Sequence, residues 1–265
     1  MTAAEPGHIS SRDNPLLKEL RKLAHDPGAY RKSGRVWLEG DHLCRAARER
    51  GVRAAIALFA ESAWPVARHE WAGAADKTVV VADALLAGVS GLESPGVMGF
   101  VLDLPAPLPI VPDAATVVLD RLQDAGNVGS ILRSAAAFGF AQVIALKGTA
   151  ALWSPKVLRA GMGAHFGLRL VEGAEPEALD TLGVPCIATS SHRGEWLHRS
   201  RLPHPCAWLM GHEGQGLSAA LETRAALQVR IAQPGGEESL NVAAAAAICL
   251  HASAAAAEGV PGRGL

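Results

Sequence analysis

The chain has 265 residues, of which 49% are hydrophobic and 19% are charged. This composition excludes a disordered protein, and the length allows one large or two medium domains with real cores. No apolar run approaches the roughly 20 residues that cross a membrane, and the first 15 residues lack the apolar core of a signal peptide, so we expect no membrane partner and a cytoplasmic location.

The charge is unevenly distributed, although its net value is only −1. Residues 1–53 hold 11 Lys and Arg against 7 Asp and Glu, a net of +4, whereas the remainder holds 14 against 19, a net of −5. A basic N-terminal part on a mildly acidic body is typical of a localised polyanion-binding face. A solvated, charged helix surface would give the same counts.

The chain first predicts a basic amphipathic helix. Asn14 precedes Pro15, and this pair is typical of a helix start because the Asn side chain accepts from free N–H groups and proline needs no partner there. Leucines then recur on one face, and the other face carries the cations Lys18, Arg21 and Lys22.

A short cationic cluster follows this helix. Tyr30 stands beside three cations, Arg31, Lys32 and Arg35. Cations can clamp backbone phosphates while an aromatic ring stacks on a base, so the cluster is a candidate nucleic-acid contact. A basic loop without a partner explains the same residues.

Residues 1–104 alternate between strand and helix patterns. We expect strands at 36–40, 54–60, 78–82 and 97–104 and helices at 41–50 and 83–89. The alternation predicts a small α/β domain. Residues 105–113 then hold four prolines, a composition typical of a semi-rigid domain linker.

Residues 114–265 restart the alternation and predict a second α/β domain with a mostly parallel sheet. The expected strands are 115–120, 142–146, 168–171, 184–189, 206–210 and 227–231, and the expected helices begin near 127, 155 and 240. The last helix is rich in alanine, the best helix former, and its small side chains suit close packing in a core or a dimer.

The first strand–helix junction of this domain, residues 120–139, is a candidate anion site. Asn127 is the expected N-cap, and Arg133 lies off the apolar stripe of the helix. A helix start and an arginine that leans back toward it would attract a phosphate or a developing alkoxide. An amphipathic helix with a solvated arginine is an equally good interpretation of this stretch alone.

Three glycine-bearing loops, 124–129, 211–216 and 234–241, each follow a predicted strand. In open α/β sheets, ligands bind beyond the carboxyl ends of the strands, and glycines let the backbone approach a ligand closely. The loops carry the polar residues Asn127, Glu213, Ser239 and Asn241. Converging with Arg133, these residues would form a site for chemistry, whereas singly each is a common turn or cap residue.

Several common active-site motifs do not occur in the sequence. A Walker A loop, a G-x-S-x-G elbow and a G-x-G-x-x-G turn are missing, which argues against P-loop NTPases, α/β-hydrolases and ordinary dinucleotide enzymes. The three histidines His192, His198 and His204 have no acidic or cysteine partner at ligand spacing, so we expect no metal.

The cysteine pattern indicates free thiols. None of the four forms a C-x-x-C pair, and their spacing fits no common zinc site. We therefore expect buried, unpaired side chains at Cys44, Cys186, Cys206 and Cys249.

The three loops, in this order and spacing, resemble the signature motifs of the SpoU (TrmH-type) RNA 2′-O-ribose methyltransferases of the SPOUT superfamily. The motifs are LDRLQDAGNVGSILRSAAAFGF, LMGHEGQGL and IAQPGGEESLNVAAAAAICL, which together span about residues 117–251. The beginning of the chain also resembles the substrate-binding extension of many family members, a small α/β domain akin to RNA-binding ribosomal proteins. Two departures are visible: His212 stands where Asn is common, and Ala232-Gln233 where Pro-Met is common.

The resemblance implies a deep trefoil knot at the C-terminal end, S-adenosylmethionine held in that knot, and a homodimer through the C-terminal domains. It implies that the cofactor lies against the backbone of Thr189, Leu209, Gly211, Ile231 and Leu240. The implied catalytic residues are Asn127, Arg133, Glu213, Ser239 and Asn241. In this assignment Asn127 orients the ribose, Glu213 fixes its neighbours, and Arg133 clamps a phosphate and stabilises alkoxide charge.

The implied reaction is methyl transfer from S-adenosylmethionine to a ribose 2′-OH, with 23S rRNA as the favoured substrate. A tRNA 2′-O-methyltransferase and a non-catalytic RNA-binding protein on the same fold are the alternatives. The expected RNA contacts of the N-terminal domain are Lys18, Arg21, Lys22, Arg31, Lys32 and Arg35.

Overall fold

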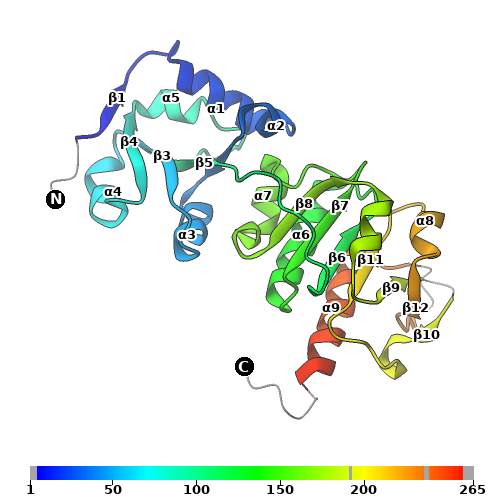
Figure 1. The fold of residues 1–265 in the computed structure, drawn as a ribbon. Helices are drawn as coiled ribbons and strands as arrows, with labels where there is room; N and C mark the ends of the chain where they lie inside the picture. The colour runs from blue at the N-terminus through cyan, green and yellow to red at the C-terminus, as the bar shows by residue number, and fades with distance from the viewer. Residues whose placement is uncertain (1–4, 191–192, 236–238, 259–265) are drawn as a thin grey trace. The chain divides into compact units, whose positions relative to one another are not determined.

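A computed structural model describes residues 5–190, 193–235 and 239–258. Its contacts divide the chain into two units (Figure 1), one formed by Met1–Ala106 with Trp153–Phe166 and the other by Pro107–Leu152 with Gly167–Leu265. The sequence predicts one continuous domain over residues 114–265. The segment 153–166 instead groups with the first unit, because helix α7 (Pro155–Gly161) packs against an N-terminal helix and strand.

The first unit is a mixed sheet with helices. Its elements are β1 (Gly7–Ile9), α1 (Pro15–His25), α2 (Ala29–Ser33), β2 (Arg35–Glu39), α3 (Asp41–Glu49), β3 (Ala54–Ala60), α4 (Trp64–Trp71), β4 (Ala75–Val81), α5 (Asp83–Ala87) and β5 (Met98–Asp103). The strand order is β1-β4-β3-β5-β2. Strands β1, β4 and β3 are parallel, and β5 runs antiparallel to both of its neighbours.

Helix α1 begins where the sequence predicts. The Asn14 side chain accepts from the Leu16 N–H at 2.9 Å, and Pro15 is the first helical residue. Helix α2 occupies part of the cationic cluster at residues 30–35, for which the sequence predicts no helix. It ends at Gly34, whose φ of 69° is a backbone conformation that glycine adopts without strain.

The second unit is built on a parallel sheet. Its main elements are β6 (Thr116–Leu119), α6 (Ala125–Ala137), β7 (Gln142–Leu146), β8 (Arg169–Ala174), β9 (Cys186–Thr189), β10 (Glu195–Trp196), β11 (Ala207–Met210), α8 (Ala219–Glu222), β12 (Ala225–Arg230) and α9 (Val242–Glu258). The strand order is β10-β12-β9-β11-β6-β7-β8, and every described pairing is parallel. All six strands predicted for this part of the chain are present, and the two-residue β10 was not predicted.

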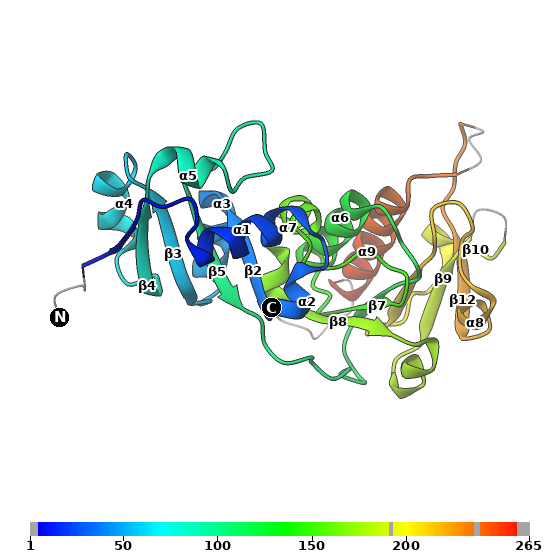
Figure 2. The ribbon, with the colours of Figure 1, turned by 90° about the horizontal axis from the view of Figure 1, so that it is seen from above.

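The centre of this sheet is covered on both faces. Strands β6, β7 and β11 are buried along their whole length, as expected for parallel strands between layers of helices and loops. Helices α6 and α9 lie side by side (Figures 1 and 2), and α9 also contacts β11. A buried hydrogen bond from Trp208 Nε1 to Ser253 Oγ, 2.9 Å long, fixes β11 to α9.

Two further expectations concern the whole chain. All four cysteines are free and buried, which confirms the prediction from their spacing. In the described part of the chain, no helix combines the length and the apolar character needed to cross a bilayer.

Candidate active site

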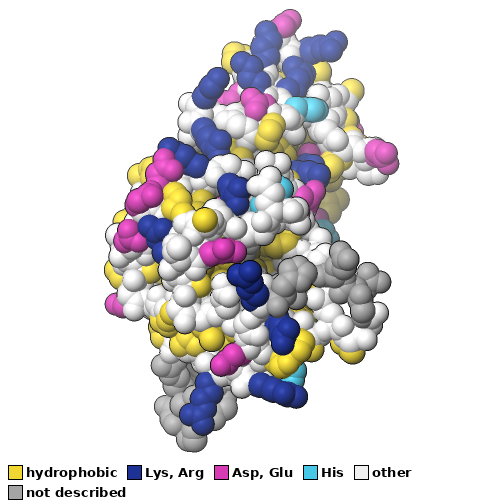
Figure 3. All heavy atoms as spheres, turned by 90° about the vertical axis from the view of Figure 1, so that its right-hand side faces the viewer, with side chains coloured by type: hydrophobic (Ala, Val, Ile, Leu, Met, Phe, Trp, Pro, Cys, Tyr) yellow, Lys and Arg dark blue, Asp and Glu magenta, His cyan; other side chains and the backbone are white. Residues whose placement is uncertain are grey.

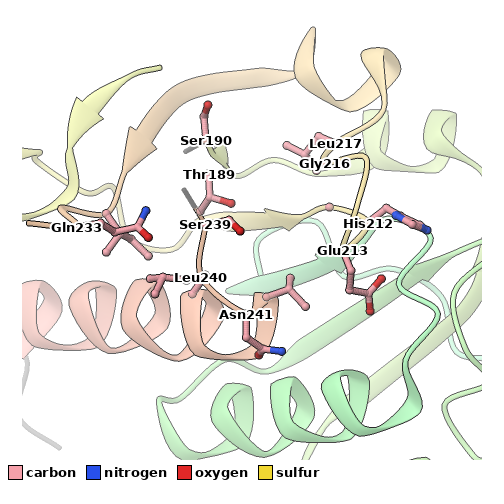
Figure 4. A pocket seen from close by; sticks show the side chains of 14 residues that line it. Thr189, Ser190, His212, Glu213, Gly216, Leu217, Gln233, Ser239, Leu240 and Asn241 are labelled. Carbon is pink, nitrogen blue, oxygen red and sulfur yellow. The ribbon is translucent and has the colours of Figure 1, made fainter. Parts of the chain in front are cut away.

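Four neighbouring strands of the parallel sheet, β12, β9, β11 and β6, end at the same edge. A cavity of about 330 Å³ lies there (Figure 4), where ligands bind in open α/β sheets. It is lined by Thr189, Ser190, Gly211, His212, Glu213, Gly216, Leu217, Ile231, Gln233, Ser239, Leu240, Asn241, Val242 and Ala245. The second and third motif loops therefore share one cavity.

A chain of hydrogen bonds joins all three motif loops beside this cavity. Asn127 Nδ2 donates to Glu213 Oε1 at 3.3 Å, and Asn127 Oδ1 accepts from Asn241 Nδ2 at 3.0 Å. Asn241 Oδ1 in turn accepts from the N–H groups of Ala243 and Ala244, so that it caps α9. Both ends of the Asn127 amide are thus engaged, and its orientation is fixed.

The start of α6 is arranged differently from our prediction. The N-cap is Asp124, not Asn127, because the Asp124 carboxylate accepts from the Asn127 N–H at 2.7 Å. Glu213 accepts from the N–H groups of Gln123 and Asp124 at 3.4 and 3.2 Å. The chain's own carboxylates therefore occupy this helix start, which we had considered as a phosphate site.

Glu213 is held as a carboxylate. Its partial burial raises the pKa, but hydrogen bonds from backbone N–H groups and from Asn127 outweigh that effect and leave the pKa below its ordinary value. An ionised Glu213 is only an acceptor, so it fixes the donors around it.

The second motif loop is a tight turn that requires glycine. His212 and Gly216 exchange two backbone hydrogen bonds of 3.0 and 2.9 Å. A Cβ atom on Gly211 would lie only 2.4 Å from the Gly216 carbonyl carbon, so a side chain there would displace the backbone. This close approach leaves the Gly211 backbone on the cavity wall.

Gln233 is a cavity residue that we had noted only as a departure from the family pattern. Its Oε1 atom is buried and has no hydrogen-bond partner among the residues that the structure describes. Buried polar atoms in proteins nearly always have partners, so an unmatched acceptor at a cavity indicates a donor on a ligand. The sequence did offer a signal for this residue, because the polar Gln233 stands where the apolar Met is common in the family.

The other predicted cofactor residues fall into two groups. Thr189, Ile231 and Leu240 line the cavity together with Gly211. Leu209 is completely buried within β11, and its side chain belongs to the hydrophobic core.

Two predicted catalytic residues stand apart from the hydrogen-bonded chain. Ser239 lines the cavity and is exposed. Arg133 is exposed on α6, does not line the cavity, and forms no hydrogen bond or ion pair with any residue that the structure describes. Six residues separate it from Asn127, which places it about 120° around the helix. A single chain thus does not bring Arg133 to Asn127 and Glu213.

The predicted RNA-contact residues lie in the first unit, at α1, α2 and the start of β2. Figure 3 shows Lys and Arg side chains gathered at the top of that view. Lys22 and Lys32 are exposed. Lys18 pairs with Asp13 at 3.0 Å, and Arg21 Nε donates to the Gly88 carbonyl.

Two residues of the cationic cluster are less available than expected. Arg35 is bound in ion pairs with Asp103 and Glu19. Tyr30 is buried beneath Arg31, whose guanidinium lies 5.4 Å from the ring centroid. A buried ring offers no free face to a base, so this burial favours the alternative in which Tyr30 does not contact nucleic acid.

Metal ligands do not gather in the described ranges. No group of three or more His, Cys, Asp or Glu side chains that could hold an ion occurs in them. His192 lies outside the described residues. His198 stacks on Trp196, with ring centroids 6.3 Å apart.

Comparisons with known proteins place these features in a family. The model of the SpoU rRNA Methylase family matches residues 114–251. An uncharacterised tRNA/rRNA methyltransferase of Synechocystis is 32% identical over 92% of each chain. The 23S rRNA (guanosine(2553)-2′-O)-methyltransferase RlmP of Bacillus subtilis is 28% identical over 92% of this chain and 97% of its own. The AdoMet-bound rRNA methyltransferase from Sinorhizobium meliloti superposes with a TM-score of 0.80 at 25% identity, over 94% of this chain and 98% of that one. This chain belongs to the SpoU rRNA methylase family.

Proposed function

We propose that this protein transfers a methyl group from S-adenosylmethionine to a ribose 2′-OH of 23S rRNA. The observation that carries the proposal is the hydrogen-bonded chain Glu213–Asn127–Asn241 beside the cavity at the carboxyl edge of the sheet. The relatives support the substrate class, since RlmP is named for 2′-O-methylation of 23S rRNA.

The cavity fits a cofactor of this kind. Its volume of about 330 Å³ lies in the range of small-molecule sites. The buried Gln233 Oε1 offers an acceptor for a ligand N–H or O–H group. The residues that would hold the cofactor are Thr189, Gly211, Ile231, Leu240 and Gln233, with Leu209 supporting them from β11. When bound, S-adenosylmethionine would supply a methyl group on a sulfonium, from which a neutral thioether is a good leaving group.

The protein's part is to position the ribose and to promote loss of the 2′-OH proton. Asn127 orients the ribose through an amide whose direction Glu213 and Asn241 fix. Ser239 and Asn241 shape the substrate side of the cavity. Arg133, which a single chain does not bring to Asn127 and Glu213, would clamp the adjacent phosphate and stabilise alkoxide charge once the proposed homodimer places it at a cavity. A guanidinium is a poor base, which argues against Arg133 as the group that removes the proton.

The first unit would bind RNA through Lys18, Arg21, Lys22, Arg31, Lys32 and Arg35. Lys22 and Lys32 carry most of this role, since both are exposed and neither has an ion-pair partner among the described residues.

We also propose the trefoil knot and the homodimer for the second unit. The knot is supported by the way the chain continues from β12, near one edge of the sheet, to α9, which returns to pack beside α6 and β11. A dimer face on α9 is supported by an exposed stripe at helical spacing, formed by Ala244, Ile248, His251 and Ala255. Ile248 is 42% exposed, which is unusual for a large apolar side chain.

The test is mass-spectrometric mapping of 2′-O-methyl groups in rRNA and tRNA from cells with and without the protein. We expect the loss of one 23S rRNA methylation, restored by the wild type and not by Arg133→Ala, whose S-adenosylmethionine binding should survive. A loss confined to tRNA would favour the tRNA enzyme. Unchanged methylation together with no cofactor binding in calorimetry would favour a non-catalytic RNA-binding protein.

A further inference from the structure

A second polar network is attached to the 211–217 loop of the cavity wall, through two residues that do not line the cavity. Asp120, directly after β6, is only 2% exposed. Its carboxylate accepts from Arg121 Nε at 2.9 Å, from Arg121 Nη2 at 3.3 Å and from the Ser218 N–H at 2.7 Å. A buried carboxylate is tolerated when it is paired and hydrogen-bonded in this way.

Arg121 extends the network into the second motif loop. Its Nη1 donates to Gln215 Oε1 at 3.1 Å, and its Nη2 lies 3.5 Å from the Gly216 carbonyl oxygen. One guanidinium thus joins the end of β6 to a loop more than 90 residues later in the chain. The same loop carries Glu213 and Gly211, which line the cavity.

The backbone of Arg121 has an unfavourable conformation that the surrounding structure must stabilise. Its φ of 57° lies in the left-handed region that disfavours side chains with a Cβ. Of the described residues other than glycine, only Arg121 and Met162 have positive φ. Such conformations persist where the surrounding structure over-determines them, and they cluster at functional sites.

The charge state of Asp120 agrees with this geometry. Burial raises its pKa, but hydrogen bonds from Arg121 and from Ser218 outweigh the burial, and the pKa lies below its ordinary value. The carboxylate is therefore ionised at neutral pH, and it orients the guanidinium by a bidentate contact.

We propose that Arg121 is a positioning residue that holds the 211–217 loop in the conformation that accepts S-adenosylmethionine. We call its contacts with Gln215 and Gly216 the strap. Asp120 orients the strap, and Gln215 and Gly216 are its points of attachment. Because the strap acts on the cavity wall and not on the reacting atoms, its loss weakens cofactor affinity more than turnover at saturating cofactor. The part concerning affinity rests on the proposed function, whereas the ordering of the loop does not.

The first measurement is hydrogen–deuterium exchange in the full chain without ligand, read at residues 211–217. Arg121→Gly removes the strap and also relieves the backbone conformation, and Arg121→Lys keeps the charge without the fork of donors. We expect at least tenfold faster exchange in the loop for Arg121→Gly and a smaller increase for Arg121→Lys. The matched control is Arg224→Lys, because Arg224 forms a similar fork with Asp180 outside the cavity. Unchanged loop exchange in both Arg121 variants would overturn the strap.

The second measurement is calorimetric titration with S-adenosylmethionine, combined with methyl-transfer kinetics. We expect Kd and KM for the cofactor to rise about tenfold in Arg121→Gly, with kcat within about twofold of wild type. The melting temperature should fall, because the buried Asp120 carboxylate loses its guanidinium partner. Arg224→Lys should match the wild type. Affinity that stays at the wild-type value while the loop exchanges faster would overturn the link to the cofactor. A wild type that does not bind the cofactor would instead refute the proposed function, and the exchange data would still decide the strap.

Discussion

The carboxylate of Glu213 holds the amide of Asn127 at 3.3 Å, although 86 residues separate them in the chain. The bond directs the Asn127 NH₂ group toward Glu213 and the Asn127 carbonyl oxygen away from it, and that oxygen accepts from Asn241. Two loops that follow different strands are thereby fixed to the start of α6. The arrangement makes Asn127 an oriented group and not a freely rotating side chain, which is what positioning a ribose requires.

Glu213→Gln tests this arrangement because it changes charge and little else. A neutral amide accepts hydrogen bonds more weakly, and its NH₂ group would face N–H donors in one of its two orientations. We expect methyl transfer to fall by at least tenfold at pH 7, with the fold retained by circular dichroism. Turnover within twofold of wild type would show that Glu213 does not set the geometry.

The lowered pKa of Glu213 predicts a pH dependence of stability that comparison with Glu213→Gln can measure. The pKa of Glu213 is lowered in the folded protein, so its ionised form stabilises the fold fully above the ordinary glutamate pKa of about 4.3. That contribution is lost as the pH falls through the lower, folded value. The difference in unfolding free energy between wild type and Glu213→Gln should therefore be constant from pH 7 to about 5 and shrink below about 4. Urea unfolding at several pH values measures it, and a difference that grew on acidification would contradict the assignment.

Gly211→Ala is expected to abolish cofactor binding. The added Cβ would lie 2.4 Å from the Gly216 carbonyl carbon and 2.5 Å from the Leu217 nitrogen. Both are backbone atoms, so relieving the clash would require the loop itself to shift. The matched control is Gly214→Ala in the same loop, whose Cβ would come no closer than 3.9 Å to the His212 side chain. Calorimetric titration with S-adenosylmethionine should separate the two variants. Equal binding by both would mean that the loop adapts to a side chain at position 211.

The sequence predicts the second unit well because its signals are local. Strands such as 142–146 are apolar runs bounded by turns, and the three loops carry recognisable motifs. The N-cap of α6 was assigned to the wrong residue because Asp124 and Asn127 are both good caps, and only the backbone distinguishes them. The placement of α7 in the first unit depends on tertiary contacts with α1 and β2. The sequence of α7 has no pattern that indicates which elements it packs against.

Ser253→Ala should destabilise the protein without touching the cavity. The Ser253 hydroxyl accepts from Trp208 Nε1 at 2.9 Å, and both side chains are completely buried. Removal of the acceptor leaves a buried indole N–H unpaired, which costs about 1–3 kcal/mol. Urea unfolding measures the loss, with the partly exposed Ser200→Ala as a control. Because Trp208 lies in the core of β11, S-adenosylmethionine affinity should stay close to wild type, and a stability loss below about 0.5 kcal/mol would contradict the role of the bond.

The double variant Lys22→Glu/Lys32→Glu should weaken RNA binding uniformly across sequences. Each phosphate contact that is lost reduces the slope of log affinity against log salt by about 0.7–0.9. Filter binding of an rRNA fragment at several salt concentrations gives both quantities. Lys77→Glu on β4 is the matched control, since Lys77 is an exposed lysine of the same unit outside the α1–α2 region. An unchanged salt slope in the double variant would exclude this surface from the RNA interface.

Asn241 has two separable roles, and two substitutions distinguish them. Its Oδ1 caps α9 by accepting from Ala243 and Ala244, while its Nδ2 donates to Asn127. Asn241→Asp keeps the cap, because a carboxylate at a helix start is favoured, but it removes the donor to Asn127. Asn241→Ala removes both. We expect Asn241→Ala to lose about 1 kcal/mol of unfolding free energy and Asn241→Asp to lose little, whereas both should lose at least tenfold in methyl transfer. If Asn241→Asp retained full activity, the bond to Asn127 would be dispensable, and the residue would serve the helix alone.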